Sequence, residues 1–218
     1  MNKLLCDDYK NVITEYEYDY IFTSPPDFEE IGSDPSKPED YQDFLTECFL
    51  QARPKKGLIT VAFTDRKANG GIVPKSSILK HVMMAMGYTI KSHKIWVKST
   101  KIDLFRLTYG NVITFGKGKT KQTMDKEFKP DVWMDGMDKY KKFSYGMPVD
   151  VPRKCILNYT NEGDIVYDPF MGSGTTAIAA FRTNRRYLGS ELNEEYWKLS
   201  AERIEEEKNS IDFIASKW

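Results

Sequence analysis

Two short segments of this 218-residue sequence combine residue types that could carry chemistry. The first is the run Thr23-Ser24-Pro25-Pro26, which ends a strand predicted over residues 19–23. Proline has no N–H group, so the carbonyls of Ser24 and Pro25 remain as free acceptors beside the Ser24 hydroxyl. Several acceptors with few donors suit a ligand group rich in N–H, such as an exocyclic amine. Taken alone, the run is more typical of an ordinary strand end.

The second segment is the glycine-rich stretch 168–176, Asp-Pro-Phe-Met-Gly-Ser-Gly-Thr-Thr. Gly172 and Gly174 can adopt positive φ and allow a ligand close to the backbone, and Ser173 or Thr175 can cap the following helix. Glu191 ends the next predicted strand, where a carboxylate can accept hydrogen bonds from the two hydroxyls of a ribose. The spacing therefore predicts a nucleoside-containing cofactor.

A dinucleotide-binding enzyme is an alternative, because Gly172, Gly174 and Ala177 also satisfy a GxGxxA pattern. Only about 40 residues follow Gly174, too few to complete a nucleotide-binding sheet in the usual order. The remaining strands must come from the N-terminal half, so the order of elements would be permuted relative to a dehydrogenase.

Hydrophobic periodicity and turn residues predict strands and helices that alternate along the chain. This pattern indicates a single α/β domain over residues 1–218, with a mainly parallel sheet and helices on both faces. Residues 27–38 read as an irregular loop. Residues 116–147 form a Lys-rich insertion without clean periodicity, apart from a short strand at 132–134.

Together, the segments 23–26 and 168–176 resemble the S-adenosyl-L-methionine-dependent DNA amino-methyltransferases, in the permuted order of their β class. The segments 147–154 and 189–196 are similar to further motifs of that family, and the resemblance spans residues 4–208. It implies a Rossmann-like sheet of seven strands, one of them antiparallel. The catalytic residues it implies are Ser24, Pro25, Pro26, Asp27 and Phe28. The cofactor-binding residues it implies are Asp7, Thr23, Asp168, Phe170, Gly172, Ser173, Gly174, Thr175, Glu191 and Asn193.

The sequence departs from the family at position 27, where an aromatic residue normally stacks on the flipped base. Asp27 stands there, followed by Phe28. Either Phe28 takes over the stacking, or Asp27 contacts the base or the loop while another aromatic residue stacks, or Asp27 is simply solvated. Serine rather than aspartate at position 24 is, by resemblance, associated with N4 of cytosine, with N6 of adenine as the alternative. Asp7 either approaches the cofactor or caps a helix.

Composition limits the remaining possibilities. Three cysteines without CxxC spacing and two histidines favour a reducing compartment and argue against a disulfide framework or a metal centre. No cysteine follows a proline in a comparable turn, which argues against a cysteine nucleophile of the carbon-5 cytosine type. Without a signal peptide or an apolar span, we expect a cytoplasmic protein of bacterial, phage or viral origin.

The formal net charge of zero conceals a basic segment. Residues 91–142 contain twelve lysines and Arg106 against six acidic residues, so the rest of the chain is acidic. We expect this segment to bind double-stranded DNA, with 116–147 as a target-recognition insertion. So small an insertion predicts a short target, a partner subunit or a homodimer. The lysines assigned to DNA are Lys98, Lys101, Lys117, Lys119 and Lys121.

Three hypotheses follow. The first is an S-adenosyl-L-methionine-dependent DNA methyltransferase, with an RNA or protein amine as a neighbouring substrate class. The second is a non-catalytic nucleic-acid-binding subunit with a decayed catalytic loop, and the third is an NAD oxidoreductase.

Overall fold

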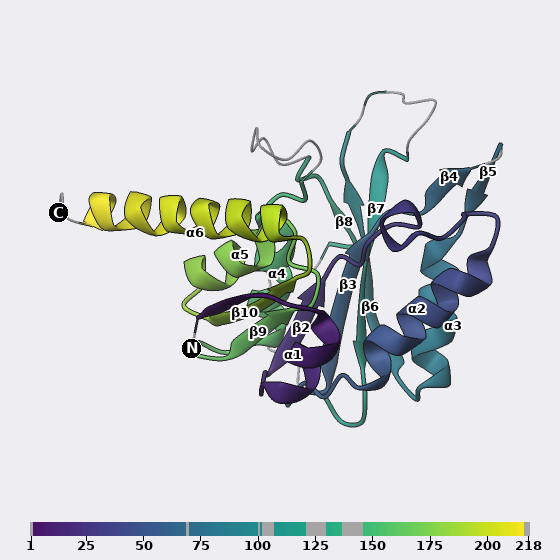
Figure 1. The fold of residues 1–218 in the computed structure, drawn as a ribbon, viewed down its shortest axis with the longest axis horizontal. Coiled ribbons are helices and arrows are strands. Elements are labelled where there is room, and N and C mark those ends of the chain that lie inside the picture. Colours follow the sequence, from purple (N-terminus) through teal and green to yellow (C-terminus); the bar gives the residue numbers. More distant parts are fainter. Residues whose placement is uncertain are drawn as a thin grey trace.

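The structure is a computed structural model. It describes residues 2–68, 70–99, 101, 107–120, 130–136 and 146–215, and for residues 211–215 it describes only the backbone. In chain order, the elements are β1 (Lys3–Cys6), α1 (Tyr9–Glu15), β2 (Tyr20–Thr23), the 3-10 helix η1 (Glu29–Ile31), α2 (Pro38–Leu50), β3 (Leu58–Phe63), β4 (Arg66–Ala68), β5 (Gly71–Val73), α3 (Lys75–Ala85), β6 (Thr89–Val97), β7 (Tyr109–Gly116), β8 (Val132–Trp133), α4 (Asp150–Tyr159), β9 (Ile165–Asp168), α5 (Thr175–Arg182), β10 (Arg186–Glu191) and α6 (Glu194–Ala215). Figure 1 shows their arrangement.

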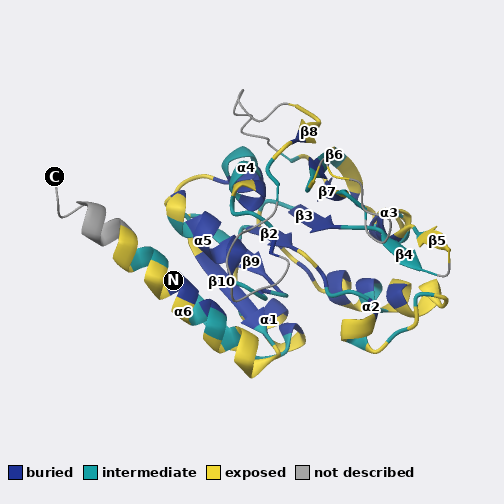
Figure 2. Cartoon of the chain, turned by 90° about the horizontal axis from the view of Figure 1, so that it is seen from above, coloured by how far each residue is buried: buried dark blue, intermediate teal, exposed yellow. Residues whose placement is uncertain are grey.

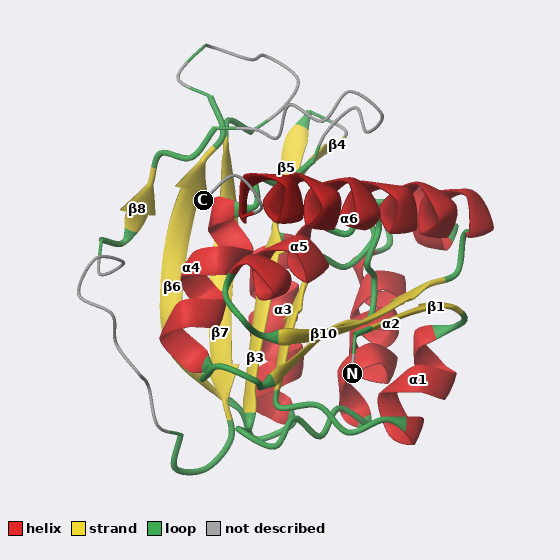
Figure 3. Ribbon diagram, turned by 90° about the vertical axis from the view of Figure 1, so that its left-hand side faces the viewer, coloured by secondary structure: helices red, strands yellow, loops and turns green. Residues whose placement is uncertain are grey.

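Eight of these strands form one sheet in the order β1-β10-β9-β2-β3-β7-β6-β8. The first five pair in parallel, whereas β7 runs antiparallel to both of its neighbours, β3 and β6. The predicted mainly parallel α/β sheet with one reversed strand is therefore confirmed. The predicted count of seven is wrong, because the two-residue strand β8 pairs with β6 and extends the sheet at its outer edge (Figure 3).

Helices cover both faces of this sheet, as the sequence predicts (Figure 2). Side chains alternate between the two faces along each strand, so Ile21 enters one core while its neighbours Tyr20 and Phe22 enter the other. The apolar sides of α1, α2 and α3 pack in the first core. Those of α4, α5 and α6 pack in the second. The β2 strand is thus held from both sides up to its last residue, Thr23, which is fully buried.

Three local elements were not predicted from the sequence. Helix α1 is only seven residues long and begins at the cap Asp8, whose side chain accepts a hydrogen bond from the Lys10 N–H. Strands β4 and β5 form a separate antiparallel hairpin. The stretch 27–38, predicted as an irregular loop, contains η1. Short elements of this kind bury too few side chains to leave a periodic pattern.

The topology brings the carboxyl ends of the parallel strands to one edge of the sheet, here called the site edge. Strands β1, β10, β9, β2, β3 and β6 share one direction, so their carboxyl ends lie together there, as does the β4–β5 hairpin that follows β3 (Figure 1). The antiparallel β7 starts at this edge and ends at the opposite one. Ligands of open parallel sheets bind outside the carboxyl ends of the strands.

Among the residues that the structure describes, no helix combines the length and the apolar character needed to cross a membrane.

Candidate active site

A hydrogen bond joins the two segments that the sequence singled out. Thr23, the last residue of β2, donates from its hydroxyl to Asp168 Oδ1 at 2.7 Å. Asp168 ends β9, the strand that pairs with β2, although the two residues are 145 positions apart in the chain. The turn 24–26 therefore begins directly beside the glycine turn 169–174.

Asp168 is the centre of this junction. The carboxylate also accepts from the Thr176 hydroxyl at 2.6 Å and from the Phe170 N–H at 3.1 Å. It is 5% exposed, and burial raises its pKa to about 6 although the three hydrogen bonds act in the opposite direction. Thr176 was not predicted as a site residue, because the resemblance directed attention to Thr175 beside it. The two strand ends are thus fixed to each other by a buried carboxylate.

The three residues of the turn after Thr23 differ in their exposure. Ser24 is exposed at the site edge, Pro25 is buried and Pro26 is half-buried. Behind the turn, the Tyr41 hydroxyl of α2 donates to the Pro26 carbonyl at 3.0 Å. Tyr41 was not among the predicted site residues. The exposed hydroxyl of Ser24 is therefore carried on a backbone that is anchored from the core side.

The glycine turn is shaped by positive φ at Gly172 (49°) and Gly174 (74°). Gly174 also faces α6 closely, since a Cβ there would lie 3.2 Å from both Ser200 Cβ and Ile204 Cδ1. Gly174 itself occupies the N-cap position of α5, so neither Ser173 nor Thr175 caps this helix as expected. The turn thus needs glycine both for its backbone and for its packing.

Replacing Gly174 with alanine is expected to destabilise the fold by more than the 1–2 kcal/mol, roughly, that positive φ costs a non-glycine residue. The added methyl group must also displace Ile204 or Ser200. Gly163→Ala is the matched control, because Gly163 has φ 80° but nothing within 4 Å of the added Cβ. Chemical denaturation of both variants measures the difference. Equal losses of stability would contradict the close packing of the turn on α6.

Glu191 lies against the glycine turn, as predicted. Its Oε2 accepts from the Gly172 N–H and its Oε1 from the Asn193 N–H, both at 2.9 Å. Asn193 is exposed and its Oδ1 accepts from the Tyr196 N–H at 3.1 Å, which starts helix α6. Asn193 therefore holds Glu191 through its backbone, and each carboxylate oxygen keeps a further lone pair for a hydroxyl.

Asp7 joins the same group from β1. Its N–H donates to the Glu191 carbonyl at 3.1 Å, and its Oδ1 accepts from the Asn11 side chain at 2.8 Å and the Asp8 N–H at 2.7 Å. Asp7 does not cap a helix, because the N-cap of α1 is its neighbour Asp8. Asp7 thus lies at the site edge next to Glu191.

Ser173 and Thr175 are turned toward α6. Their hydroxyls are 2.9 Å apart, and Arg203 donates from Nη1 to the Ser173 carbonyl at 3.0 Å and to Thr175 Oγ1 at 3.2 Å. Arg203 is 7% exposed and was not predicted from the sequence. A single arginine on a charged helix gives no signal that it reaches a turn 30 residues away. These three residues support the glycine turn from behind.

Phe170 is half-buried beside this turn. Its ring packs against Tyr9 of α1, with centroids 5.0 Å apart, and against Phe44 of α2 at 5.8 Å. The predicted cofactor residue Phe170 thus connects the glycine turn to the helices of the first core.

The structure argues against Phe28 as a stacking residue. Phe28 is fully buried and packs on Tyr41 with ring centroids 4.5 Å apart. Asp27 is not a freely solvated loop residue either, because Lys75 Nζ donates to its Oδ1 at 3.1 Å. Lys75 directly follows a proline at the start of α3 and gave no sequence signal.

The predicted basic surface is divided between the two edges of the sheet. Lys98 follows β6 at the site edge and donates to Thr64 Oγ1 at 2.9 Å, and Lys101 follows shortly after. Lys117 follows the reversed strand β7, and its N–H donates to the carbonyl of Gly57, which precedes β3. Lys117 and Lys119 are therefore a full strand length, roughly 20 Å, from the site edge. The structure thus separates Lys117 and Lys119 from Lys98 by the length of the sheet, and Lys121 lies outside the described residues.

Two of the three cysteines lie in the two cores. Cys48 and Cys155 are buried, which raises the pKa of the Cys48 thiol to about 12 and also raises that of Cys155. Neither is available as a thiolate nucleophile at neutral pH. Cys6 is exposed at the end of β1 and does not pack in the core. Among the described residues, no three His, Cys, Asp or Glu side chains lie close enough to hold a metal ion.

Comparisons with known proteins agree with this arrangement. The model of a family described as DNA methylase matches residues 18–202. The orphan methyltransferase M.BamHII of Bacillus amyloliquefaciens is 32% identical over 175 residues, which make up 78% of this chain and 57% of that protein. The chain thus spans little more than half the length of this relative.

Solved structures show the same fold. The structure of TTHA0409, described as a putative DNA modification methylase from Thermus thermophilus complexed with S-adenosyl-L-methionine, has a TM-score of 0.76 at 22% identity and covers 95% of this chain and 96% of its own. The cytosine-N4-specific PvuII DNA methyltransferase has a TM-score of 0.80 at 17% identity, with 92% and 85% covered.

Proposed function

Because the chain belongs to the DNA methylase family of N6 and N4 amino-methyltransferases, we propose that it transfers a methyl group from S-adenosyl-L-methionine to an exocyclic amine of a base flipped out of double-stranded DNA. N4 of cytosine is the amine we put first, and N6 of adenine is the alternative. The proposal is supported by the hydrogen bond from Thr23 to Asp168, which joins the start of the turn 24–26, here called the catalytic turn, to the glycine turn.

The turn has the chemistry that an amine substrate needs. The amino group of a base is a poor nucleophile because its lone pair is delocalised into the ring. The Ser24 hydroxyl and the Pro25 carbonyl can accept the two amino hydrogens and hold the nitrogen closer to a tetrahedral geometry. The lone pair is then localised and aimed for in-line attack, and positioning supplies much of the rate. In the overall reaction the amine gains the methyl group and gives up one proton to solvent, and the bond from the methyl carbon to sulfur breaks, which leaves S-adenosyl-L-homocysteine as the second product.

The residues of the glycine turn fit the proposed cofactor. The Glu191 carboxylate is fixed by two backbone N–H groups and keeps lone pairs for ribose hydroxyls. Asp7, Phe170 and the backbone of residues 172–174 line the same end of the turn. When bound, S-adenosyl-L-methionine supplies an electrophilic methyl group on a sulfonium. The protein's part is to hold the amine in line with that methyl group.

The proposed DNA contact uses only part of the basic segment. Lys98 and Lys101 are at the site edge, where a duplex with its base in the catalytic turn must lie. We infer that 116–147 is a target-recognition insertion within a single domain. Its described part is tied to the sheet by β8 and to helix α4 by the ion pair of Lys154 with Asp135 at 2.6 Å. An insertion of this size suits a short target, or a recognition surface completed by a homodimer or a partner subunit.

Reversing one charge at the site edge is expected to weaken DNA binding. Lys98→Glu should raise the Kd several-fold at low salt and reduce the slope of log K against log salt by about 1, because a phosphate contact is lost. Lys117→Glu is the matched control at the opposite edge and should leave both quantities unchanged. Fluorescence anisotropy over a salt series measures them. A larger effect of Lys117→Glu would move the duplex to the other edge.

Labelled S-adenosyl-L-methionine with duplex DNA, RNA and protein substrates tests the proposed function. We expect the label in duplex DNA. Cofactor binding without transfer to any substrate would favour a non-catalytic nucleic-acid-binding subunit. Binding of NADH in preference to S-adenosyl-L-methionine would favour an oxidoreductase and overturn the proposal.

A further inference from the structure

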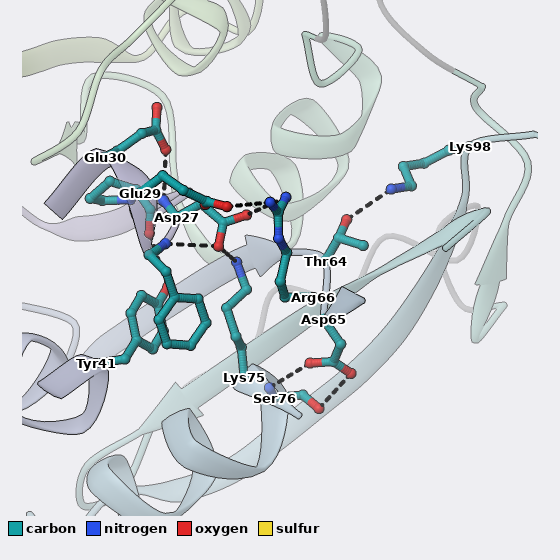
Figure 4. A network of polar contacts seen from close by, with 12 residues as sticks. Asp27, Glu29, Glu30, Tyr41, Thr64, Asp65, Arg66, Lys75, Ser76 and Lys98 are labelled. Carbon is teal, nitrogen blue, oxygen red and sulfur yellow. Dashed lines mark hydrogen bonds and ion pairs between the residues drawn. The ribbon is translucent and has the colours of Figure 1, made fainter. Parts of the chain in front are cut away.

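A lysine side chain is buried directly behind the catalytic turn. Lys75, the first residue of α3, is 3% exposed, and its ammonium lies 5.5 Å from the centre of the Tyr41 ring. An ammonium group removed from water is costly unless an anion compensates its charge. The compensating group is Asp27, which accepts from Lys75 Nζ at 3.1 Å (Figure 4).

The carboxylate of Asp27 is partly exposed and has further contacts with the protein. Besides Lys75, its Oδ1 accepts from the Phe28 N–H at 2.9 Å, and its Oδ2 lies 3.7 Å from Arg66 Nη1. Arg66 belongs to β4 and also pairs with Glu29. The Asp27 N–H donates to Glu30 Oε2 at 2.6 Å. The Asp27 carboxylate therefore lies between the cations of Lys75 and Arg66, as Figure 4 shows.

These contacts hold three successive residues of the turn. The Pro26 carbonyl is held by the Tyr41 hydroxyl, Asp27 by the Lys75 ammonium, and Phe28 by the ring of Tyr41. All three holding groups come from α2 and α3, the helices of the first core. Ser24 and Pro25 are covalently continuous with this anchored segment, so its position sets where their acceptor atoms lie.

We propose that Lys75 is a positioning residue of the catalytic turn and that Asp27 is its counterion rather than a contact to the base. The inference rests on the proposed function for its effect on rate. It accounts for the aspartate at position 27, because an aromatic residue there would leave the buried ammonium of Lys75 with Arg66 nearby and no anion in contact. Lys75 acts through Asp27 and does not touch the substrate.

The test is a double-mutant cycle with Asp27→Asn, Lys75→Met and the double variant. Each single variant is expected to slow single-turnover methyl transfer by about 10- to 100-fold at saturating DNA and cofactor, with the Kd for S-adenosyl-L-methionine unchanged. Asp27→Asn leaves the buried ammonium of Lys75 without its anion, and Lys75→Met leaves the Asp27 carboxylate with Arg66 as its remaining cation. The double variant removes both charges. Its rate should be at least fivefold higher than the rate expected if the two single effects simply multiplied. The pair of Lys55 with Glu17, exposed and remote from the site, provides the control variants Lys55→Met and Glu17→Gln, which should keep the wild-type rate.

Three results would overturn the inference: a wild-type rate for Lys75→Met, multiplicative effects in the cycle, or a change in base preference with Asp27→Asn alone. The unfolding equilibrium of the same four proteins is the second readout. If the wild type methylates no DNA, the proposed function fails. The unfolding measurements still test whether Asp27 and Lys75 interact as an ion pair. Non-additive unfolding effects then support the pairing, and additive effects contradict it.

Discussion

Replacing Ser24 with alanine is expected to lower the single-turnover rate of methyl transfer by about 10²- to 10³-fold, the range found when one preorganised hydrogen-bonding group is removed from a catalytic site. The variant retains the Pro25 carbonyl but loses the hydroxyl that accepts the second amino hydrogen. The amine is then free to flatten into conjugation with the ring, and its lone pair is no longer aimed at the methyl group.

The structure separates this effect from folding. Ser24 is exposed, so its substitution should leave the free energy of unfolding within about 0.5 kcal/mol of the wild type. The Kd for S-adenosyl-L-methionine should also be unchanged, because the glycine turn is not altered. Ser36→Ala, an exposed serine of the following loop, is the matched control. Near-wild-type transfer by the Ser24 variant would remove the hydroxyl from the mechanism.

Replacing Asp168 with alanine is expected to damage both halves of the site. The hydroxyls of Thr23 and Thr176 and the N–H of Phe170 would lose their acceptor. Unpaired buried groups cost about 1–3 kcal/mol each, so we expect a loss of about 3 kcal/mol or more in stability. At a temperature where the variant is folded, cofactor affinity and methyl transfer should both fall at least 100-fold. Calorimetric titration and a single-turnover assay measure these effects, and intact cofactor binding would contradict the role of this junction.

Asp168 also predicts a dependence of stability on pH. Burial raises its pKa to about 6 in the folded protein, above its usual value of 3.8. The folded state therefore binds this proton more tightly, and its contribution to stability is complete below pH 4 and is lost as the pH rises through 6. The slope is at most about 1.4 kcal/mol per pH unit. Denaturation of the wild type and of Asp168→Asn between pH 4 and 7 should show this difference, and parallel curves would contradict it.

The sequence predicted the main chemistry of the site because its signals are local. The prolines after Thr23, the glycines at 172 and 174, and Glu191 at the next strand end each mark a turn whose geometry depends on neighbouring residues. The alternation of strands and helices then places these turns at one edge of a parallel sheet. The contact of Thr23 with Asp168 follows once β2 and β9 are neighbours, which only the permuted order of strands implies.

The features that the sequence did not indicate are non-local. Lys117 and Lys119 were grouped with Lys98 because they are close in sequence, but the reversed direction of β7 carries them to the opposite edge. Phe28 was a stacking candidate by position, and its burial depends on Tyr41 of α2. Lys75 and Arg203 reach the site from helices whose sequence pattern gives no indication of their targets.

The most direct test of the central proposal is the nucleoside composition of DNA from cells that express this protein, determined by mass spectrometry beside cells that express Ser24→Ala. We predict N4-methylcytosine in the first sample and none above background in the second. N6-methyladenine in the first sample alone would retain the DNA amino-methyltransferase and change its base. The absence of both modified nucleosides, with the folded protein present and its cognate duplex available, would contradict the account.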